Sequence, residues 1–512
     1  MSQTADLPGA PGTPGAASRT VSSRRAWASL AVLLGGTFMS LLDTTIVNVA
    51  LPTIRDSIDA SEATLSWIIS GYALAFGLAL IPAGRLGDRY GHKWVFGAGL
   101  AVFTAASLWC GLAGDSTHLI LARVVQGLGG GMFFPAVTAF IQLLFEPRRR
   151  GKPFAIMGAV IGVASALGPI VGGLIIRAVG EETGWRWVFA VNVPIGVLGL
   201  VAAALILPRG AGRRAESADL VGLALLAAGL VAILVPLIQG QDEGWPLWTY
   251  LSMVGGVVTL VLFALWERHV AARGKAPLVP PHLFSHPQFT GGTVLATVYF
   301  AAFTSIFFAI SLLWQVGLGH DALSAGLVAT PFAIGTIVGS SQSDRLAARF
   351  GRSVLLIGTG LVAASLIAVW LILTTVATPD LTSWDLLGPL LIGGIGSGLF
   401  IAPNARFIVA TVDPAEAGAA SGVIGTAQRI GSAIGIAVIG SVLFGNAHLD
   451  TVGTDVQAGL ADGTYTSPSA ATAGTLAAHF GPAAADALAV SAAFAVLAFL
   501  LVFALPKRVS LH

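Results

Sequence analysis

The chain has 512 residues, of which 55% are hydrophobic and only 10% are charged. A soluble globular protein carries about 25% charged residues, so this composition excludes an ordinary water-facing surface, and it excludes a disordered chain as well. Because 27 Lys and Arg residues oppose 25 Asp and Glu residues, the net charge of +2 offers little attraction for phosphates. The composition therefore predicts a polytopic membrane protein that does not bind nucleic acid.

Apolar stretches of about 20 residues, long enough to cross a bilayer as helices, recur along the whole chain. We expect an all-α protein with fourteen spans near residues 27–51, 62–84, 94–113, 118–144, 153–177, 187–207, 219–239, 247–266, 289–314, 323–343, 353–376, 386–412, 417–445 and 484–505.

These spans group as six, two and six. The predicted regions are a disordered cytoplasmic tail (1–26), an N-terminal six-helix bundle (27–207), a two-helix insert with cytoplasmic linkers (208–288), a C-terminal six-helix bundle (289–505) that contains a long outer loop (446–483), and a short cytoplasmic tail (506–512).

Basic residues predict the orientation of the chain, because cytoplasmic loops of membrane proteins are enriched in Lys and Arg. With a cytoplasmic N-terminus, 21 of the 27 basic residues fall in inner segments, three in outer loops and three inside spans. Both termini are therefore expected in the cytoplasm. The single cysteine, Cys110, and nine histidines in loops or at span edges suggest no metal site. No Walker motif is present, so we expect neither ATP nor another cofactor to drive the protein.

The two bundles carry matching segments at corresponding places. Residues 84–91 follow the second span of the first bundle, and residues 344–351 follow the second span of the other, with four identities at an offset of 260. Residues 131–135 also resemble residues 398–403. Secondary transporters are built from such repeats, and their substrate site lies near the midplane between the repeats.

Asp43 is the only carboxylate well inside a predicted span, and ionisable groups there are functional candidates. Desolvation disfavours the charged form of a carboxylate and a nearby cation favours it, so a group subject to both can take up and release a proton. Arg123, at a similar depth in the fourth span, is the candidate cation. Two interpretations stay open: a proton-coupling site, or a permanent ion pair that only joins two helices.

The short turn after the second span combines glycines with opposite charges. Its glycines permit a tight turn, and Asp88 between two arginines can exchange partners between the bundles. This predicts a conformational latch, whereas a plain basic cytoplasmic loop is the alternative. The candidate latch residues are Gly84, Arg85, Asp88, Arg89, Gly91 and Lys93.

Two further groups of residues are candidates. In the fifth span, Gly168, Pro169, Gly172 and Gly173 suit a bending or sealing element, or ordinary close packing. Arg429 lies near mid-bilayer, where it faces an anionic substrate group, water or a helix C-terminus. The possible substrate path comprises Asn48, Trp67, Tyr72, Gln126, Gln428 and Arg429, although lipid-facing packing would explain the aromatic residues equally well.

Together these motifs resemble those of the major facilitator superfamily, and specifically of its fourteen-span drug:proton antiporters. Residues 42–52 look like the first-span motif of that subfamily, and residues 84–93 are similar to the loop motif of the superfamily. Residues 123–127 resemble the fourth-span motif, and residues 168–173 resemble a fifth-span motif that marks exporters. The resemblance covers nearly the whole chain, from Trp27 to about Leu505.

The resemblance implies a major facilitator fold and a proton-coupled antiporter, not an enzyme, that exports hydrophobic or amphiphilic drugs or antibiotics by alternating access. The proton motive force would drive it, Asp43 and Arg123 would couple protons, and a monomer in the bacterial cytoplasmic membrane is expected. A proton-coupled nutrient importer and a non-transporting membrane sensor remain alternatives. One departure stands out: Ala348 and Asp344 occupy the second-half loop where Asp and Gly are usual, which predicts a differently wired contact.

Overall fold

The structure is a computed structural model that describes residues 22–506 except 61, 181, 210–218, 241–242, 276, 414–415, 448–450 and 466. The side chains of some further helical residues, including Asn48 and Pro169, also lie outside the description. Within this part of the chain every regular element is helical.

The first half contains α1 (Ser23–Ile58), α2 (Glu62–Tyr90), α3 (His92–Gly111), α4 (Ser116–Leu144), η1 (Pro147–Arg149), α5 (Gly151–Val179), α6 (Gly184–Ala190) and α7 (Asn192–Ile206). The insert contains α8 (Leu220–Gln239), α9 (Leu247–Ala272) and η2 (Pro281–Ser285). The second half contains α10 (Pro287–Leu312), η3 (Leu313–Gly317), α11 (Ala322–Val328), α12 (Thr330–Phe350), α13 (Ser353–Thr375), η4 (Thr378–Asp380), α14 (Ser383–Val409), α15 (Ala417–Asn446), α16 (Val452–Ala461) and α17 (Pro468–Ala504).

Twelve helical segments in the described residues are long and apolar enough to cross a membrane. Helices α5 and α8 add shorter apolar segments, Gly151–Ala164 and Ile170–Val179 in the first and Val221–Leu237 in the second. The protein is therefore a multi-pass, all-α membrane protein, and the count of fourteen spans stays a prediction.

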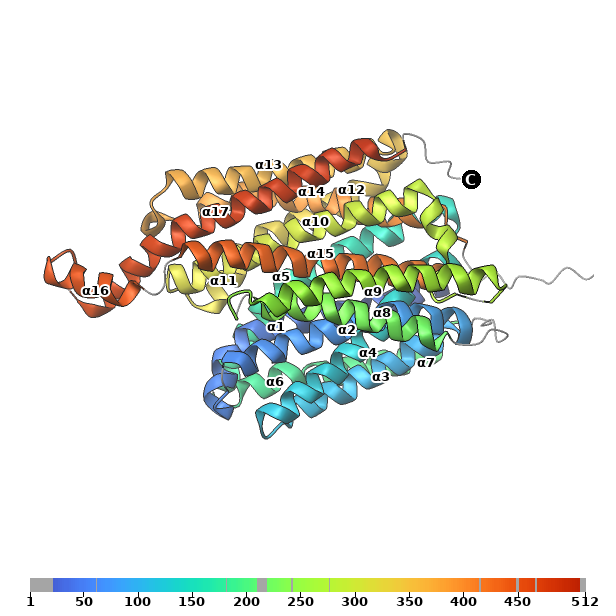
Figure 1. Cartoon of the computed structure of the whole chain (residues 1–512), viewed down its shortest axis with the longest axis horizontal. Coiled ribbons are helices and arrows are strands. Elements are labelled where there is room, and N and C mark those ends of the chain that lie inside the picture. The colour runs from blue at the N-terminus through green and yellow to red at the C-terminus, as the bar shows by residue number, and fades with distance from the viewer. Residues whose placement is uncertain are drawn as a thin grey trace, which may run out of the picture.

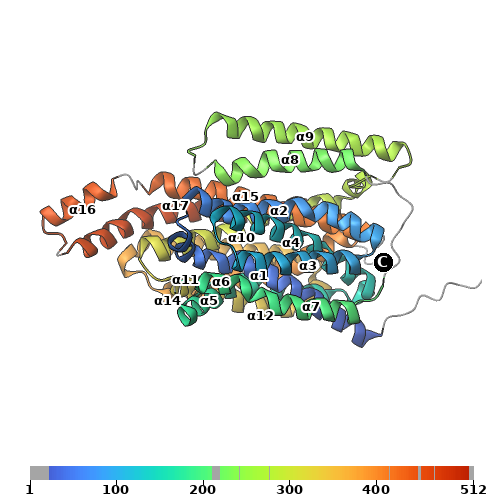
Figure 2. The ribbon, with the colours of Figure 1, turned by 90° about the horizontal axis from the view of Figure 1, so that it is seen from below.

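The helix packing repeats from one half to the other. Helix α4 packs against α2 and α3, as α14 packs against α12 and α13, and α1 pairs with α5 as α10 pairs with α15. The halves meet through two related contacts, α2 with α15 and α5 with α12. The first half lies below the second in Figure 1, and the insert α8–α9 lies outside the bundles, beside α2 and α15, in Figure 2.

Three predicted boundaries differ from the structure. Helix α1 begins at Ser23, inside the predicted tail, because Ser22 accepts a hydrogen bond from the Arg25 backbone N–H as N-cap. The predicted sixth span divides into α6 and α7 at Val191. The predicted outer loop 446–483 contains α16 and the first turns of α17, which project beyond the bundle (Figure 2).

The local sequence explains why the predicted outer loop forms helices. Ser467 caps α17 and Pro468 occupies its first turn, a favoured start for a helix, and the alanines that follow are strong helix formers. The Tyr465 ring fills the space beside Gly459 and Gly474, which joins α16 to α17. The loop is predicted because these residues are not strongly apolar, but they form helices nevertheless.

Glycines allow α4 to lie directly against α2. A Cβ atom on Gly131 would overlap the Phe76 carbonyl oxygen, and one on Gly127 would overlap the Tyr72 carbonyl oxygen. Small residues at helix interfaces permit such close backbone approach in membranes. This contact positions the α2 and α4 side chains that form the site described below.

We expect Gly131→Ala to destabilise the protein by about 1–3 kcal/mol, because the added methyl group must separate α2 from α4. The matched control is Gly97→Ala on α3, where nothing lies within 4 Å of the added carbon. Thermal unfolding of both variants in detergent measures the difference. Equal melting temperatures for the two variants would contradict this account of the packing.

Candidate functional site

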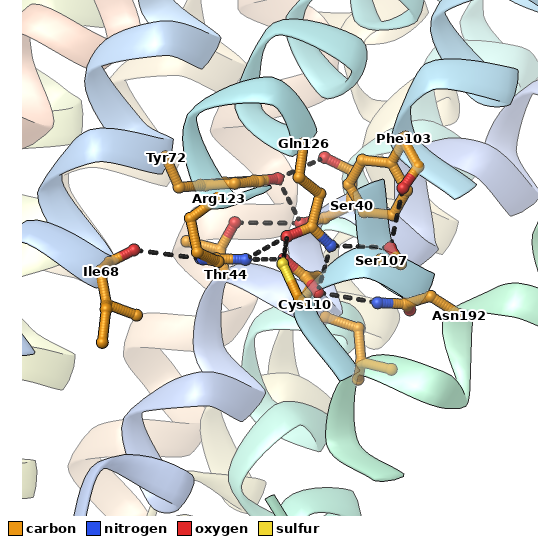
Figure 3. Close-up of polar contacts among 12 residues, drawn as sticks. Ser40, Thr44, Ile68, Tyr72, Phe103, Ser107, Cys110, Arg123, Gln126 and Asn192 are labelled. Carbon is orange, nitrogen blue, oxygen red and sulfur yellow. Dashed lines mark hydrogen bonds and ion pairs between the residues drawn. The ribbon is translucent and has the colours of Figure 1, made fainter. Parts of the chain in front are cut away.

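Asp43 lies on α1 with none of its surface exposed, at the point where α1, α4 and α7 meet. Its Oδ2 atom accepts a hydrogen bond from Arg123 Nη1 at 2.5 Å. Its Oδ1 atom accepts from Gln126 Nε2 at 3.0 Å and from Asn192 Nδ2 at 2.7 Å. Figure 3 shows these donors, Arg123 and Gln126 from α4 and Asn192 from α7, pointing toward one another. The structure therefore pairs Asp43 with Arg123, a contact that the sequence left open.

Arg123 is enclosed as completely as its partner, with 1% of its surface exposed. Its Nε atom donates to the Ile68 carbonyl oxygen at 3.1 Å, and Nη1 also donates to Gln126 Oε1 at 2.7 Å. The guanidinium lies 4.1 Å from the centre of the Tyr72 ring and 5.6 Å from that of Phe189. Arginine suits such a position because it combines planar hydrogen bonding with stacking on aromatic faces.

Further polar groups hold in place the side chains that contact Asp43. Gln126 Nε2 also donates to Ser107 Oγ at 2.8 Å, and the Tyr72 hydroxyl lies 3.1 Å from Ser40 Oγ. Gln126 and Tyr72, assigned from sequence to the substrate path, thus lie in the carboxylate site. Ser107 and Asn192 were not predicted for this site, although each is a polar residue within an apolar segment.

A carboxylate on α2 joins the two halves at the helix ends that are predicted to be cytoplasmic. Asp88 accepts hydrogen bonds from the backbone N–H groups of Gly418 and Ala419, both at 3.0 Å, in the first turn of α15. A negative charge is favourable there because unpaired N–H groups and the helix dipole make a helix N-terminus positive. A Cβ atom on Gly84 would overlap the Gly418 carbonyl oxygen, so glycine is needed for this contact.

The other predicted latch residues have separate partners. Arg85 donates to the Pro277 carbonyl oxygen in the linker between α9 and η2. Lys93 donates to the carbonyl oxygens of Ala204 and Leu207, at 2.6 and 2.8 Å, and so caps α7 in its own bundle. Arg89 lies 5.0 Å from the centre of the Tyr90 ring, and Gly91 adopts a φ of 97° between α2 and α3.

The second half makes a related contact with different residues. Asp344 of α12 forms an ion pair with Arg406 of α14 at 3.0 Å. It also lies directly against Gly151, the first residue of α5, where any side chain would overlap its carboxylate. Asp344 stands where a glycine is usual in the loop motif. Its carboxylate therefore faces the start of α5, in the other half, from an earlier position in the motif than the usual aspartate.

A second buried carboxylate occurs in the insert. Glu267 is 2% exposed, and its Oε2 atom accepts a hydrogen bond from the Val279 backbone N–H at 2.7 Å. Asp219, the N-cap of α8, accepts from the indole N–H of Trp266 at 3.0 Å. The predicted span ends at 266, whereas α9 continues to Ala272. Glu267 was therefore not predicted to be a buried carboxylate.

The fifth-span glycines pack α5 against α1 beside Asp43. Cβ atoms on Gly168 and Gly172 would overlap Thr45 and Ile46, and Gly173 faces Leu323 of α11. Helix α5 runs unbroken through Pro169, whose side chain, like that of Asn48, is outside the described residues. Trp67 on α2 and Gln428 on α15 are partly exposed.

The profile of the Major Facilitator Superfamily matches residues 33–436. The chain therefore belongs to this superfamily of membrane transporters, as its motifs predicted.

Individual relatives cover most of the chain. It is 37% identical to the probable actinorhodin transporter of Streptomyces coelicolor, over 88% of this chain and 78% of that protein. It is 35% identical to the puromycin resistance protein pur8 of Streptomyces alboniger, over 93% and 92% of the two chains. It is also 35% identical to the cephamycin export protein CmcT of Amycolatopsis lactamdurans, over 83% and 87%.

Solved structures share the fold. The proton:xylose symporter XylE matches with a TM-score of 0.62 and 14% identity, over 94% of this chain and 96% of that chain. The human organic anion transporter MFSD10 matches with a TM-score of 0.64 and 15% identity, over 93% and 99%. At such low identity these neighbours establish the architecture alone.

Replacing Arg123 by Gln should destabilise the protein by about 3–5 kcal/mol, because Asp43 would keep a buried charge without a counter-ion. The double variant Asp43→Asn/Arg123→Gln should lose less than the sum of the two single variants. Unfolding in detergent measures this cycle, with the exposed Arg177→Gln as control. Additive losses would show that the two side chains are not coupled.

Replacing Asp88 by Asn should loosen the contact with α15 by about 1 kcal/mol, which corresponds to a roughly fivefold change in population. We would place a cysteine at the buried Ser421 in a Cys110→Ser background and label it with an impermeant maleimide in inside-out vesicles. Labelling should accelerate in Asp88→Asn and not in Asp115→Asn, at the exposed N-cap of α4. Equal rates would show that Asp88 does not hold α2 and α15 together.

Proposed function

We propose that the protein is a proton-coupled efflux antiporter, not an enzyme, that exports hydrophobic or amphiphilic drugs or antibiotics. It acts as a monomer in the bacterial cytoplasmic membrane, with both termini in the cytoplasm. Its similarity to the cephamycin export protein and the puromycin resistance protein supports export. The enclosed Asp43–Arg123 pair supports proton coupling and is the observation that carries the mechanism.

The donors around Asp43 suggest how proton binding changes the conformation. Arg123, Gln126 and Asn192 all present N–H groups to its two oxygen atoms. A protonated carboxyl group carries an O–H that must donate, and an N–H group cannot accept it. This arrangement therefore fits the charged carboxylate. Proton uptake requires a donor to withdraw or the amide of Gln126 or Asn192 to turn its oxygen toward the new O–H, so it changes the contacts that join α4 and α7 to α1.

The cytoplasmic contacts suggest which stage of transport the structure represents. The Asp88 contact with α15 and the Asp344 contact with α5 hold the two halves together on that side. In the proposed cycle, substrate enters from the cytoplasm and displaces a proton from Asp43. The halves then close on the inside, Asp43 is reprotonated from outside, and substrate leaves. A charged Asp43 with closed inner ends corresponds to the stage after proton release.

Asp43→Asn should reduce proton-driven efflux to background, because an amide cannot carry the proton, while the similar shape preserves most of the packing. Puromycin accumulation in cells that lack their own pumps measures efflux, with Asp115→Asn as the control. Wild-type cells should accumulate less puromycin than control cells, and collapse of the proton gradient should remove the difference. Normal efflux by Asp43→Asn, or efflux that survives collapse of the gradient, would exclude the proposed coupling.

A further inference from the structure

We infer that Arg429 binds an anionic group of the transported compound, so that the preferred substrates are amphiphilic aromatic anions. The inference rests on the proposed export function and adds a substrate class to it. The three arginines inside the predicted spans differ in whether the protein supplies a carboxylate partner.

Two of these arginines have a carboxylate partner. Arg123 pairs with Asp43 at 2.5 Å, and Arg406 pairs with Asp344 at 3.0 Å. The guanidinium of Arg429, near the middle of α15, has no hydrogen-bond or ion-pair partner among the described residues. A lone charge in the bilayer interior is costly unless it faces water or a counter-ion. Among the described residues, the N–H groups of Arg429 therefore have no acceptor, whereas those of the other two arginines do.

The donors of Arg429 are not sealed inside the protein. The residue is partly exposed, and its nitrogen atoms are absent from the fully buried, unpartnered polar atoms, which include Arg89 Nε. The two neighbours before and after it on α15, Gln428 and Ile430, are also partly exposed. A guanidinium that is not completely covered by protein atoms can offer its N–H groups to a ligand.

The surroundings of Arg429 combine a cation with aromatic surface. Its guanidinium lies 4.1 Å from the centre of the Phe76 ring on α2, and Phe76 meets the Phe134 ring at 5.6 Å. Phe76 and Phe134 belong to the first half and Arg429 to the second, so the site lies between the halves, where transporters of this kind bind substrate. A stacked guanidinium still offers donors in its plane to a carboxylate or sulfonate.

Helix α2 places this site next to the proton-coupling site. Tyr72 and Phe76 are one helical turn apart with ring centres 5.9 Å apart, and each lies 4.1 Å from one guanidinium, of Arg123 and Arg429 respectively. A shift of α2 therefore moves both sites together. Asp43, the carboxylate of the neighbouring site, is occupied by its own donors, so the local field favours anions and disfavours cations.

The test compares two probes with the same ring system, the anion anilinonaphthalene sulfonate and the neutral phenylnaphthylamine. Equilibrium dialysis with purified full-length protein measures binding, and proteoliposomes with an imposed proton gradient measure transport. The variants are Arg429→Gln, the charge-preserving Arg429→Lys, and the exposed Arg177→Gln as control. If Arg429→Gln does not fold, Arg429→Met removes the charge at similar side-chain length.

We expect the wild type to bind the sulfonate more tightly than the neutral probe. Loss of the charge should weaken sulfonate binding by roughly tenfold or more and leave phenylnaphthylamine binding unchanged. Arg429→Lys should retain most of the preference, and Arg177→Gln all of it. No preference in the wild type, no binding of the sulfonate, or an equal loss for both probes would overturn the inference.

The outcomes separate this inference from the proposed function. Proton-driven efflux of phenylnaphthylamine that needs Asp43 but not Arg429, without any preference for the sulfonate, would support the antiporter and refute the anion site. Sulfonate-selective binding that depends on Arg429, without proton-driven transport of either probe, would support the site and refute the antiporter.

Discussion

The structure depends on the requirement that a charge inside the membrane be neutralised. Asp43 and Arg123 meet this requirement together: each is almost completely buried, and hydrogen bonds occupy both carboxylate oxygens. Removing water from two ions is expensive, and their attraction compensates only when the geometry is good. The close packing of α2 on α4 and the polar groups from α3 and α7 therefore serve one pair, and movement of any of these helices changes its balance.

The same electrostatic rule acts in a different form where α2 meets the start of α15 and α12 meets the start of α5. Asp88 faces the first turn of α15, and Asp344, which pairs with Arg406 of its own half, faces the first residue of α5. Both contacts join one half to the other, and neither requires a buried cation from the opposite half. A contact between a carboxylate and a helix start is weaker than the enclosed ion pair. This difference suits ends that separate repeatedly around a core that stays folded.

Sequence predicted best where the physical signal is local. The predicted spans coincide with helices because a bilayer demands about 20 apolar residues per crossing, and this can be read without knowing any contact. The α16 helix and the start of α17 were predicted as loop because the sequence there is not strongly apolar, although its alanines favour a helix. Glu267 was not recognised because its buried position depends on the backbone of Val279, which lies beyond the end of α9.

The class of protein, the repeat of two bundles and the few charged residues that the membrane makes important can all be read from the sequence. The partners of those residues cannot, because they depend on helix packing. Gln126, predicted for the substrate path, contacts the Asp43 carboxylate, and Lys93, predicted for the latch, caps α7. Arg429 has no counter-ion among the described residues. The reason is physical: hydrophobicity and charge belong to single residues, whereas neutralisation is a property of pairs, and the residues of these pairs are brought together only by helix packing.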